Sequence, residues 1–221
     1  MVFGMYGFMA KLIASGKMKF TEGKISLLGE PMAIVSMNAI KEMTDYAEKK
    51  GSDVISEFYF QGWIYGYTFT YNMAKAYNLK KFAERYKLAM DVAALCGFGD
   101  YKTLNFKKAH SSKFRVLGNP FALMYHPSDR RVCHFLRGMN GGGGTVVHER
   151  MVDCIELECA AQNGKYCLQT NVTEQAMKDN KIDPKLIKEQ LDLKKLRPKQ
   201  LALIKSMGHD PKVYTSKREI E

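Results

Sequence analysis

The sequence predicts an α+β fold, in which helices pack on one side of an antiparallel sheet. Helical periodicity fills most of residues 38–96, and short stretches of alternating apolar and polar residues follow it. Helices followed by consecutive strands favour an antiparallel sheet, whereas a parallel sheet would alternate strands with helices along the chain. From Asn171 the composition changes to lysine-rich amphipathic segments, which predict a short helical C-terminal appendage.

Length and composition indicate one main packed domain. The chain has 221 residues, of which 46% are hydrophobic and 26% are charged, as is typical of a folded globular protein. We expect a main domain over residues 1–171 and a basic helical tail over residues 172–221. No apolar run approaches the roughly 18 residues of a membrane span, and no basic segment precedes the first apolar stretch. The protein is therefore expected in the cytoplasm, with no membrane partner.

The chain is expected to open with β structure and to continue with helices. Apolar and polar residues alternate on both sides of Thr21-Glu22-Gly23, which predicts a hairpin with one apolar face. Residues 38–50 are predicted to form a helix that Gly51 closes. Asp53 is then predicted to cap a longer helix that runs to about Ala76.

The clearest helical pattern lies between Leu79 and Cys96, where apolar residues recur at steps of three and four before Gly97. Half-buried strands are predicted around residues 102–108 and 114–116, and again at 152–156 and 166–170. In the tail, Asp183-Pro184 and Pro198 are each predicted to start a helix, the second ending near Gly208.

The long helix is unusually aromatic, with more rings than one core-facing stripe requires. Some of these rings are expected to line a cavity, although the core or a dimer contact would also bury them. Gly62 and Gly66 lie one turn apart on the same helix, which suits close helix packing or a symmetric homodimer. The aromatic residues are Phe58, Tyr59, Phe60, Trp63, Tyr65, Tyr67 and Phe69.

The only biased run is Gly141 to Gly144. It lacks the Lys-Ser/Thr of a phosphate-binding P-loop and the GxGxxG spacing of a dinucleotide site, so a nucleotide fingerprint is excluded. Inside a helix each glycine would cost about 1 kcal/mol relative to alanine. The run therefore predicts close backbone packing or a loop.

The formal charge of +11 favours acidic partners. Basic residues are scattered along the chain, and no dense block of them is interleaved with aromatics, so nucleic acid is a secondary hypothesis. It would use the tail helices, where basic residues gather, and its mark would be salt-dependent binding to duplex DNA. These residues are Lys185, Lys188, Lys194, Lys195, Arg197 and Lys199.

Four of the five cysteines fall between residues 133 and 167, which points toward metal or catalysis in a cytosolic chain, whereas Cys96 is expected to be an ordinary buried thiol. Cys159 and Cys167 flank an Asn-Gly turn that can bring their sulfurs together. Cys133 and one carboxylate from the preceding strand would complete a tetrahedral set, and soft sulfur ligands select zinc. Rival ligands are Cys154, His134 and His148.

The order of Cys133, Gly138, Glu156-x-x-Cys159 and Cys167 resembles the 4-vinyl reductase domain family, which includes the sensor domains of phenol-responsive bacterial activators. The resemblance covers most of residues 1–171. It implies a zinc ion held by Cys133, Glu156, Cys159 and Cys167, with Glu156 rather than Glu158 as the carboxylate. It also implies binding of a small hydrophobic or aromatic ligand.

One departure from the family pattern is the position of the turn glycine, which lies five residues after Cys159 instead of four. A closed set of four protein ligands leaves no open position on zinc, so the site is expected to be structural and the protein non-catalytic. The sequence also shows no Ser/His/Asp or Cys/His arrangement and no flavin or nicotinamide motif. An enzyme or accessory protein in tetrapyrrole vinyl reduction is the alternative that the family name suggests.

Overall fold

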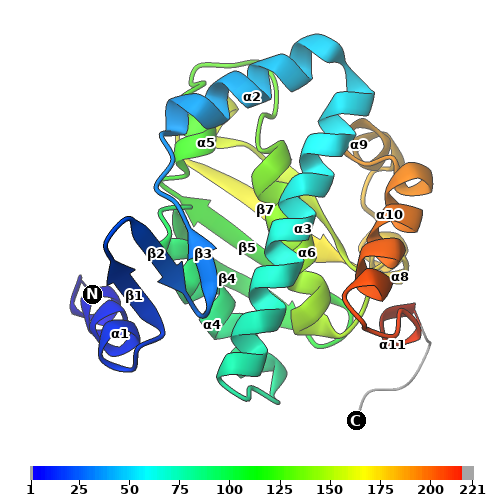
Figure 1. Cartoon of the computed structure of the whole chain (residues 1–221). Helices are drawn as coiled ribbons and strands as arrows, with labels where there is room; N and C mark the ends of the chain where they lie inside the picture. Colours follow the sequence, from blue (N-terminus) through cyan, green and yellow to red (C-terminus); the bar gives the residue numbers. More distant parts are fainter. Residues whose placement is uncertain (1, 216–221) are drawn as a thin grey trace.

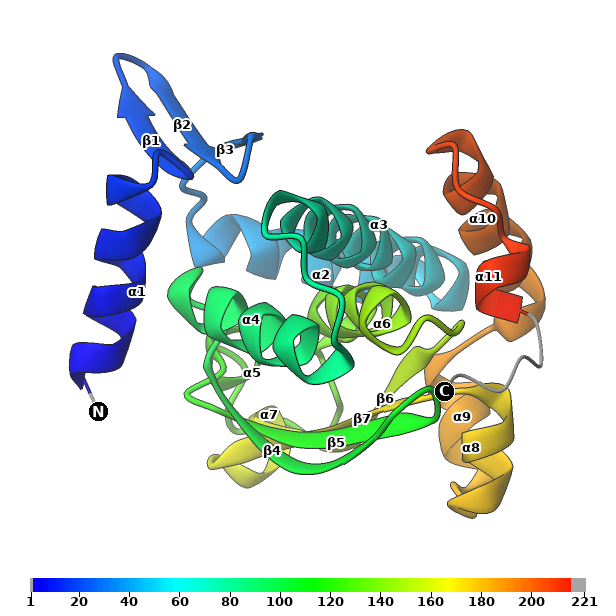
Figure 2. The same ribbon diagram turned by 90° about the horizontal axis from the view of Figure 1, so that it is seen from below.

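The computed structural model describes residues 2–215, with side chains from Gly7 onward. It confirms the α+β class, because helices cover one side of an antiparallel sheet (Figures 1 and 2). None of the helices in the described part of the chain is long and apolar enough to cross a membrane.

The N-terminal segment forms an arm that stands away from the sheet (Figure 2). The predicted hairpin is confirmed by β1 (Met18–Thr21) and β2 (Lys24–Leu27), to which β3 (Glu30–Met32) adds a third antiparallel strand. The expectation that the chain opens with β structure is wrong, since α1 (Val2–Ala14) precedes the hairpin. Leu12 of α1 and Leu27 of β2 are buried in one small core, which explains why this apolar first segment is helical and packed.

The main sheet has four strands in the order β4-β5-β7-β6, and every neighbouring pair is antiparallel. The four strands overlap the predicted segments and extend them by a few residues. The alternation that predicted β5 reappears as Ser112, Phe114 and Val116, all buried on one face. The strands are β4 (Asp100–Lys107), β5 (Ser111–Leu117), β6 (Asp153–Glu158) and β7 (Tyr166–Val172).

The helices between the arm and the sheet follow the predicted order. Gly51, at φ 95°, ends the first of them and begins the next, so Asp53 is not the cap that the sequence predicted. The side chain of Asp53 instead forms an ion pair with Lys195 of the tail at 2.6 Å. These helices are α2 (Met37–Lys50), α3 (Ser52–Ala76) and α4 (Phe82–Leu95). The short α5 (Pro120–Leu123) and α7 (Ala160–Asn163) and the central α6 (His134–His148) come later in the chain, where the sequence predicted no helix bounds.

Glycines on α3 let this helix touch the backbone of α6 directly. A Cβ atom added at Gly62 would lie 2.1 Å from the carbonyl oxygen of Phe135, and one at Gly66 would lie 1.9 Å from that of Met139. The small-residue face that suggested a homodimer is therefore occupied within the chain. The dimer remains a prediction and loses this argument.

The glycines of α6 are the other half of the same contact. A Cβ atom at Gly138 would lie 1.9 Å from the carbonyl oxygen of Tyr59, and one at Gly142 would lie 2.0 Å from that of Trp63. Of the two interpretations of the run Gly141 to Gly144, close backbone packing is the one that the structure shows. The helical cost of these glycines is offset by the close approach of two buried helices.

The tail is helical and lies beside β6 (Figure 2), where the side chain of Gln190 is hydrogen-bonded to the backbone of Glu156. Leu191, Leu196 and Ile204 are buried in the same core as Tyr59 and Trp63 of α3. The tail helices are α8 (Glu174–Asp179), α9 (Pro184–Gln190), α10 (Leu193–Ser206) and α11 (Lys212–Thr215).

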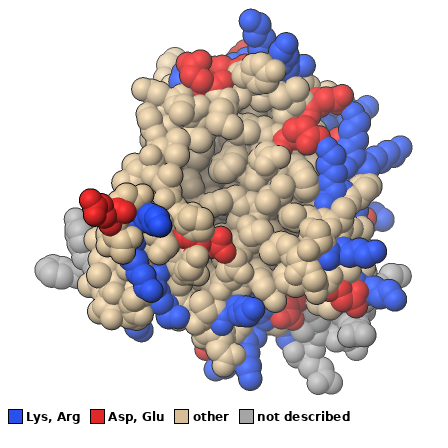
Figure 3. Space-filling model, in the orientation of Figure 1, with Lys and Arg blue, Asp and Glu red and all other residues tan. Residues whose placement is uncertain are grey.

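The start of α10 differs from the prediction. The side chain of Asp192 accepts a hydrogen bond from the backbone N–H of Lys195 and fixes the start at Leu193, so Pro198 lies inside the helix. Lys and Arg side chains gather at the tail edge (Figure 3). Part of this charge is neutralised within the chain, because Lys199 pairs with Glu57 and Arg197 pairs with Asp153 at 2.9 Å.

Candidate metal centre and cavity

The four residues predicted to hold zinc come from four elements that meet at one end of the sheet. Cys133 immediately precedes α6, Glu156 lies on β6, Cys159 precedes α7, and Cys167 lies on β7. The antiparallel pairing of β6 with β7 and the short turn of α7 bring the last three together. All four side chains are buried.

The distances in this cluster suit a tetrahedral metal site. The Sγ atom of Cys133 lies 3.9 Å from that of Cys159 and 3.7 Å from that of Cys167. Zn–S bonds of about 2.3 Å in a tetrahedron place two sulfurs about 3.8 Å apart. One ligand atom from each of the four residues, Glu156 included, lies within 4.8 Å of the others. The cluster could therefore hold a metal ion.

The charges of the cluster also suit a cation. Burial and, to a smaller extent, the adjacent Cys159 raise the pKa of Glu156 to about 8. Hydrogen bonds from Cys133 and Cys167 hold the pKa of the Cys159 thiol far below its usual range, and the contact with Cys159 raises that of Cys133. Four buried acids this close cannot all ionise unless a cation compensates them. The Oε2 atom of Glu156 also accepts no hydrogen bond from the described residues.

Neutral and positive groups support the cluster from outside. Asn119, fully buried, donates from Nδ2 to the Sγ atoms of Cys133 at 3.2 Å and Cys167 at 3.1 Å. The backbone N–H of Ala160 donates to the Sγ atom of Cys167 at 3.3 Å. The buried guanidinium of Arg137 lowers the pKa of Glu156 and so favours the ionised ligand. Such outer contacts orient ligands and tune a metal site.

Sequence reasoning missed Asn119, although a weaker signal was present. Asn119-Pro120 is a typical start of a helix, and the Oδ1 atom of Asn119 does accept a hydrogen bond from the backbone N–H of Phe121 as the N-cap of α5. The same side chain uses its amide nitrogen for the two sulfurs. A capping pattern alone carries no information about this second role.

The rival ligands lie outside the cluster. Cys154 donates to the Oε1 atom of Gln169 at 3.5 Å, and the Nε2 atom of His134 pairs with Glu48 at 2.5 Å. His148 is at the far end of α6, where its Nε2 atom lies 3.2 Å from the Oγ atom of Ser112. The other carboxylate, Glu158, is exposed.

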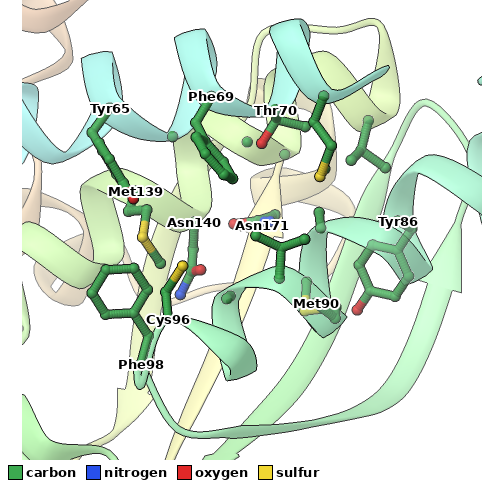
Figure 4. A pocket seen from close by; sticks show the side chains of 18 residues that line it. Tyr65, Phe69, Thr70, Tyr86, Met90, Cys96, Phe98, Met139, Asn140 and Asn171 are labelled. Atoms are coloured by element: carbon green, nitrogen blue, oxygen red, sulfur yellow. The ribbon is translucent and has the colours of Figure 1, made fainter. Parts of the chain in front are cut away.

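A second feature is a cavity of about 50 Å³ between α3, α4, α6 and β7. Figure 4 shows side chains from these elements converging on it. Of the eight aromatic residues of α3, Tyr65 and Phe69 line the cavity, whereas Tyr59, Trp63 and Tyr67 are fully buried in the core. The wall also contains Thr70, Met73, Tyr86, Met90, Cys96, Phe98, Met139, Asn140 and Asn171.

The cavity wall is mostly apolar but contains a buried amide oxygen to which no described residue donates. Asn171 on β7 is 1% exposed, and no donor among the described residues reaches its Oδ1 atom. A buried amide oxygen without a partner costs roughly 1–3 kcal/mol. Sequence reasoning missed this residue, because a single Asn after a predicted strand is indistinguishable from a loop residue.

Comparisons with known proteins show the fold. The sequence matches no protein-family model and no curated protein. Among solved structures, 12 chains match. One is the crystal structure of the phenol-responsive sensory domain of the transcription activator PoxR with phenol. It superposes with a TM-score of 0.68 at 15% sequence identity, over 85% of this chain and 98% of that chain. The expected likeness to phenol-responsive sensor domains is thus confirmed for the fold.

Proposed function

We propose that this protein is a small-molecule-binding module, a sensor or carrier, that takes a compact aromatic or otherwise apolar ligand in the cavity beside α6. The observation that carries the proposal is the mostly apolar cavity whose wall includes Asn171, a buried residue with an Oδ1 atom that no donor among the described residues reaches. Apolar walls with a few convergent polar groups are typical of ligand sites. The likeness to a sensory domain solved with phenol supports the same class of ligand.

The chemistry of the wall defines the ligand. Aromatic and methionine side chains favour a ring, and the Oδ1 atom of Asn171 favours one hydrogen-bond donor, such as a phenolic hydroxyl. The cavity of about 50 Å³ is smaller than the roughly 150 Å³ of an apolar cavity that takes benzene. Binding therefore requires side chains to move, and Met73, Met90 and Met139 have the flexibility for this.

The metal in this proposal is zinc, with Cys133, Glu156, Cys159 and Cys167 as its ligands. Three sulfurs and one carboxylate oxygen favour zinc over magnesium or calcium. Four protein ligands fill a tetrahedron, so zinc would be structural and would tie α6 to the sheet. No catalytic step is assigned to it.

The experiment that tests ligand binding is calorimetric titration with phenol against the wild type and two leucine variants. Ala93→Leu fills the cavity wall on α4, and Ala83→Leu adds the same side chain at an exposed position of the same helix. We expect phenol to bind the wild type and Ala83→Leu, and binding to Ala93→Leu to be at least tenfold weaker. Equal phenol affinity in both variants would place the ligand elsewhere.

Anisole tests the polar contact separately, because its methyl ether keeps the ring and lacks the hydroxyl donor. If Asn171 accepts a hydrogen bond from the ligand, phenol should bind roughly tenfold more tightly than anisole, a difference of about 1.4 kcal/mol. Equal affinities would remove Asn171 from the proposal and leave the apolar cavity.

A further inference from the structure

A chain of buried hydrogen bonds runs from the cavity wall to the metal cluster. The hydroxyl of Tyr101 donates to the Oδ1 atom of Asn140 at 3.1 Å, and the Nδ2 atom of Asn140 donates to the Oε1 atom of Gln169 at 2.8 Å. The Nε2 atom of Gln169 then donates to the Oε1 atom of Glu156 at 3.0 Å. The four residues come from β4, α6, β7 and β6.

The chain has a direction, because each amide has one donating and one accepting end. Turning the Gln169 amide around would set its oxygen against a carboxylate oxygen of Glu156 and its nitrogen against that of Asn140. Gln169 is fully buried and Asn140 is 7% exposed, so water cannot compensate such a mismatch. Cys154 also donates to the Oε1 atom of Gln169, at 3.5 Å, and favours the same orientation.

The two ends of this chain serve different sites. Glu156 is the one oxygen ligand proposed for the cluster. Gln169 donates a hydrogen bond to its Oε1 atom, and its Oε2 atom has no hydrogen-bond donor among the described residues. Asn140 is a wall residue of the cavity and is labelled there in Figure 4. One amide, Gln169, therefore separates the cavity wall from a metal ligand.

We propose that Asn140 and Gln169 are positioning residues that couple occupancy of the cavity to metal affinity. A ligand that packs against Asn140 restricts the movement of its side chain, which steadies Gln169 and through it the Glu156 carboxylate. Coupling of this kind is reciprocal, so zinc also raises the affinity of the cavity for its ligand. The coupling rests on the proposed function, whereas the support of Glu156 by the two amides does not.

The metal end is tested by zinc affinity, measured by competition with a chromogenic chelator and without any cavity ligand. Gln169→Met keeps the size of the side chain and removes its hydrogen bonds to Asn140, Glu156 and Cys154. It should weaken zinc binding 10- to 100-fold, as is usual for outer-shell residues. Thr170→Val is the matched control, because Thr170 is the next residue on β7 and its buried hydroxyl bonds to the backbone of Ser112 instead.

Asn140→Leu tests the chain one bond further away. Among the described residues, Asn140 makes no hydrogen bond to any of the four predicted ligands. Its loss should nevertheless weaken zinc binding roughly three- to tenfold, because Asn140 supports Gln169. A merely structural role would lower the melting temperature in all three variants and leave zinc affinity unchanged. Zinc affinity at the wild-type value in Gln169→Met would overturn the proposal.

The coupling itself is tested with phenol as the probe. Saturating phenol should tighten zinc binding at least fivefold in the wild type and less than twofold in Gln169→Met. If phenol binds and zinc affinity does not change, the coupling is wrong while the proposed function stands. If phenol does not bind, the proposed function and the coupling both fail for this ligand, and the chelator competition still decides whether the amides support Glu156.

Discussion

Two adjacent glycines of α6, Gly142 and Gly143, have opposite structural roles. Toward α3, Gly142 brings two backbones into contact, because a Cβ atom there would lie 2.0 Å from the carbonyl oxygen of Trp63. The adjacent Gly143 lines the cavity, and the nearest atom to a Cβ there would be the Oγ1 of the Thr70 side chain of α3, at 2.9 Å. One glycine closes an interface, and its neighbour contributes to a cavity.

The difference teaches where this fold is fixed and where it can move. On the closed side, α6 is held by backbone contact with α3 and starts at Cys133 in the metal cluster. On the open side, methionines and a small cavity separate it from α4. Close-packed backbone cannot shift without losing its contacts, whereas flexible side chains can rearrange. We therefore expect ligand-induced movement on the α4 side.

The largest effect should come from the metal cluster. Cys159→Ser removes one of the four proposed zinc ligands, and the protein should then lose zinc and much of its stability together, because metal binding is coupled to folding. Zinc present at a thousand times its Kd contributes about 4 kcal/mol to the free energy of unfolding. Metal analysis and thermal melting measure the two losses.

The controls are two other cysteines. Cys96→Ser and Cys154→Ser should retain zinc, because neither thiol belongs to the cluster. Chelation of the wild type should also increase hydrogen exchange across residues 130–170. An unchanged melt and unchanged exchange after zinc removal would contradict a structural metal and reopen the enzyme hypothesis.

The next effect tests the comparison of the two glycines directly. Gly142→Ala should destabilise the protein by about 3 kcal/mol or more, because backbone atoms must shift to admit the methyl group. Gly143→Ala should cost about 1 kcal/mol or less, since the Thr70 side chain can turn and alanine favours the helix. Urea unfolding of both variants measures the difference.

A third alanine shows what the substitution does without a neighbour. A Cβ atom at Gly7 in α1 would meet nothing within 4 Å, so Gly7→Ala should be neutral or stabilise the protein by up to about 1 kcal/mol. Equal free energies of unfolding for Gly142→Ala and Gly143→Ala would show that the backbone contact at Gly142 and the cavity wall at Gly143 do not differ as the structure indicates.

The sequence predicted most of the fold because its elements have local signals. Alternation marked β4 and β5 of the main sheet, and Gly51 marked the boundary of two helices. The errors lie where a helix cap or a tertiary contact determined where an element begins. Gly51, and not Asp53, is the N-cap of α3. Asp192 is the N-cap of α10, which therefore begins before Pro198, the predicted first residue.

The candidate site divides in the same way. Cysteine is rare and chemically distinctive, so four residues far apart in the sequence could be proposed as one cluster, although the choice of Glu156 depended on a family resemblance. The cavity could not be assigned, since its wall combines residues of α3, α4, α6 and β7 that carry no shared pattern. Gln169 was missed because a buried glutamine acquires its role only through its two partners.

The smallest effect concerns the far end of α6 and depends on pH. His148 is fully buried, its Nδ1 atom has no partner among the described residues, and its ring stacks on Phe106. Burial lowers the pKa of His148 from 6.5 to about 3, with the nearby His110 contributing. The folded protein therefore keeps this imidazole neutral at a pH where the unfolded chain protonates it.

The sign follows from proton binding. Below a pH of about 6.5 the unfolded state binds a proton that the folded state does not, so the free energy of unfolding falls as the pH falls. Between pH of about 7.5 and about 5.5, His148 should account for a loss of about 1.4 kcal/mol. His148→Gln should remove that part of the slope in urea unfolding with excess zinc. Ser112→Ala, which removes the hydrogen-bond partner and keeps the imidazole, should lower stability at every pH and keep the slope. A slope unchanged in His148→Gln would mean that the end of α6 admits water and a proton, and that the helix is less firmly held there than at Cys133.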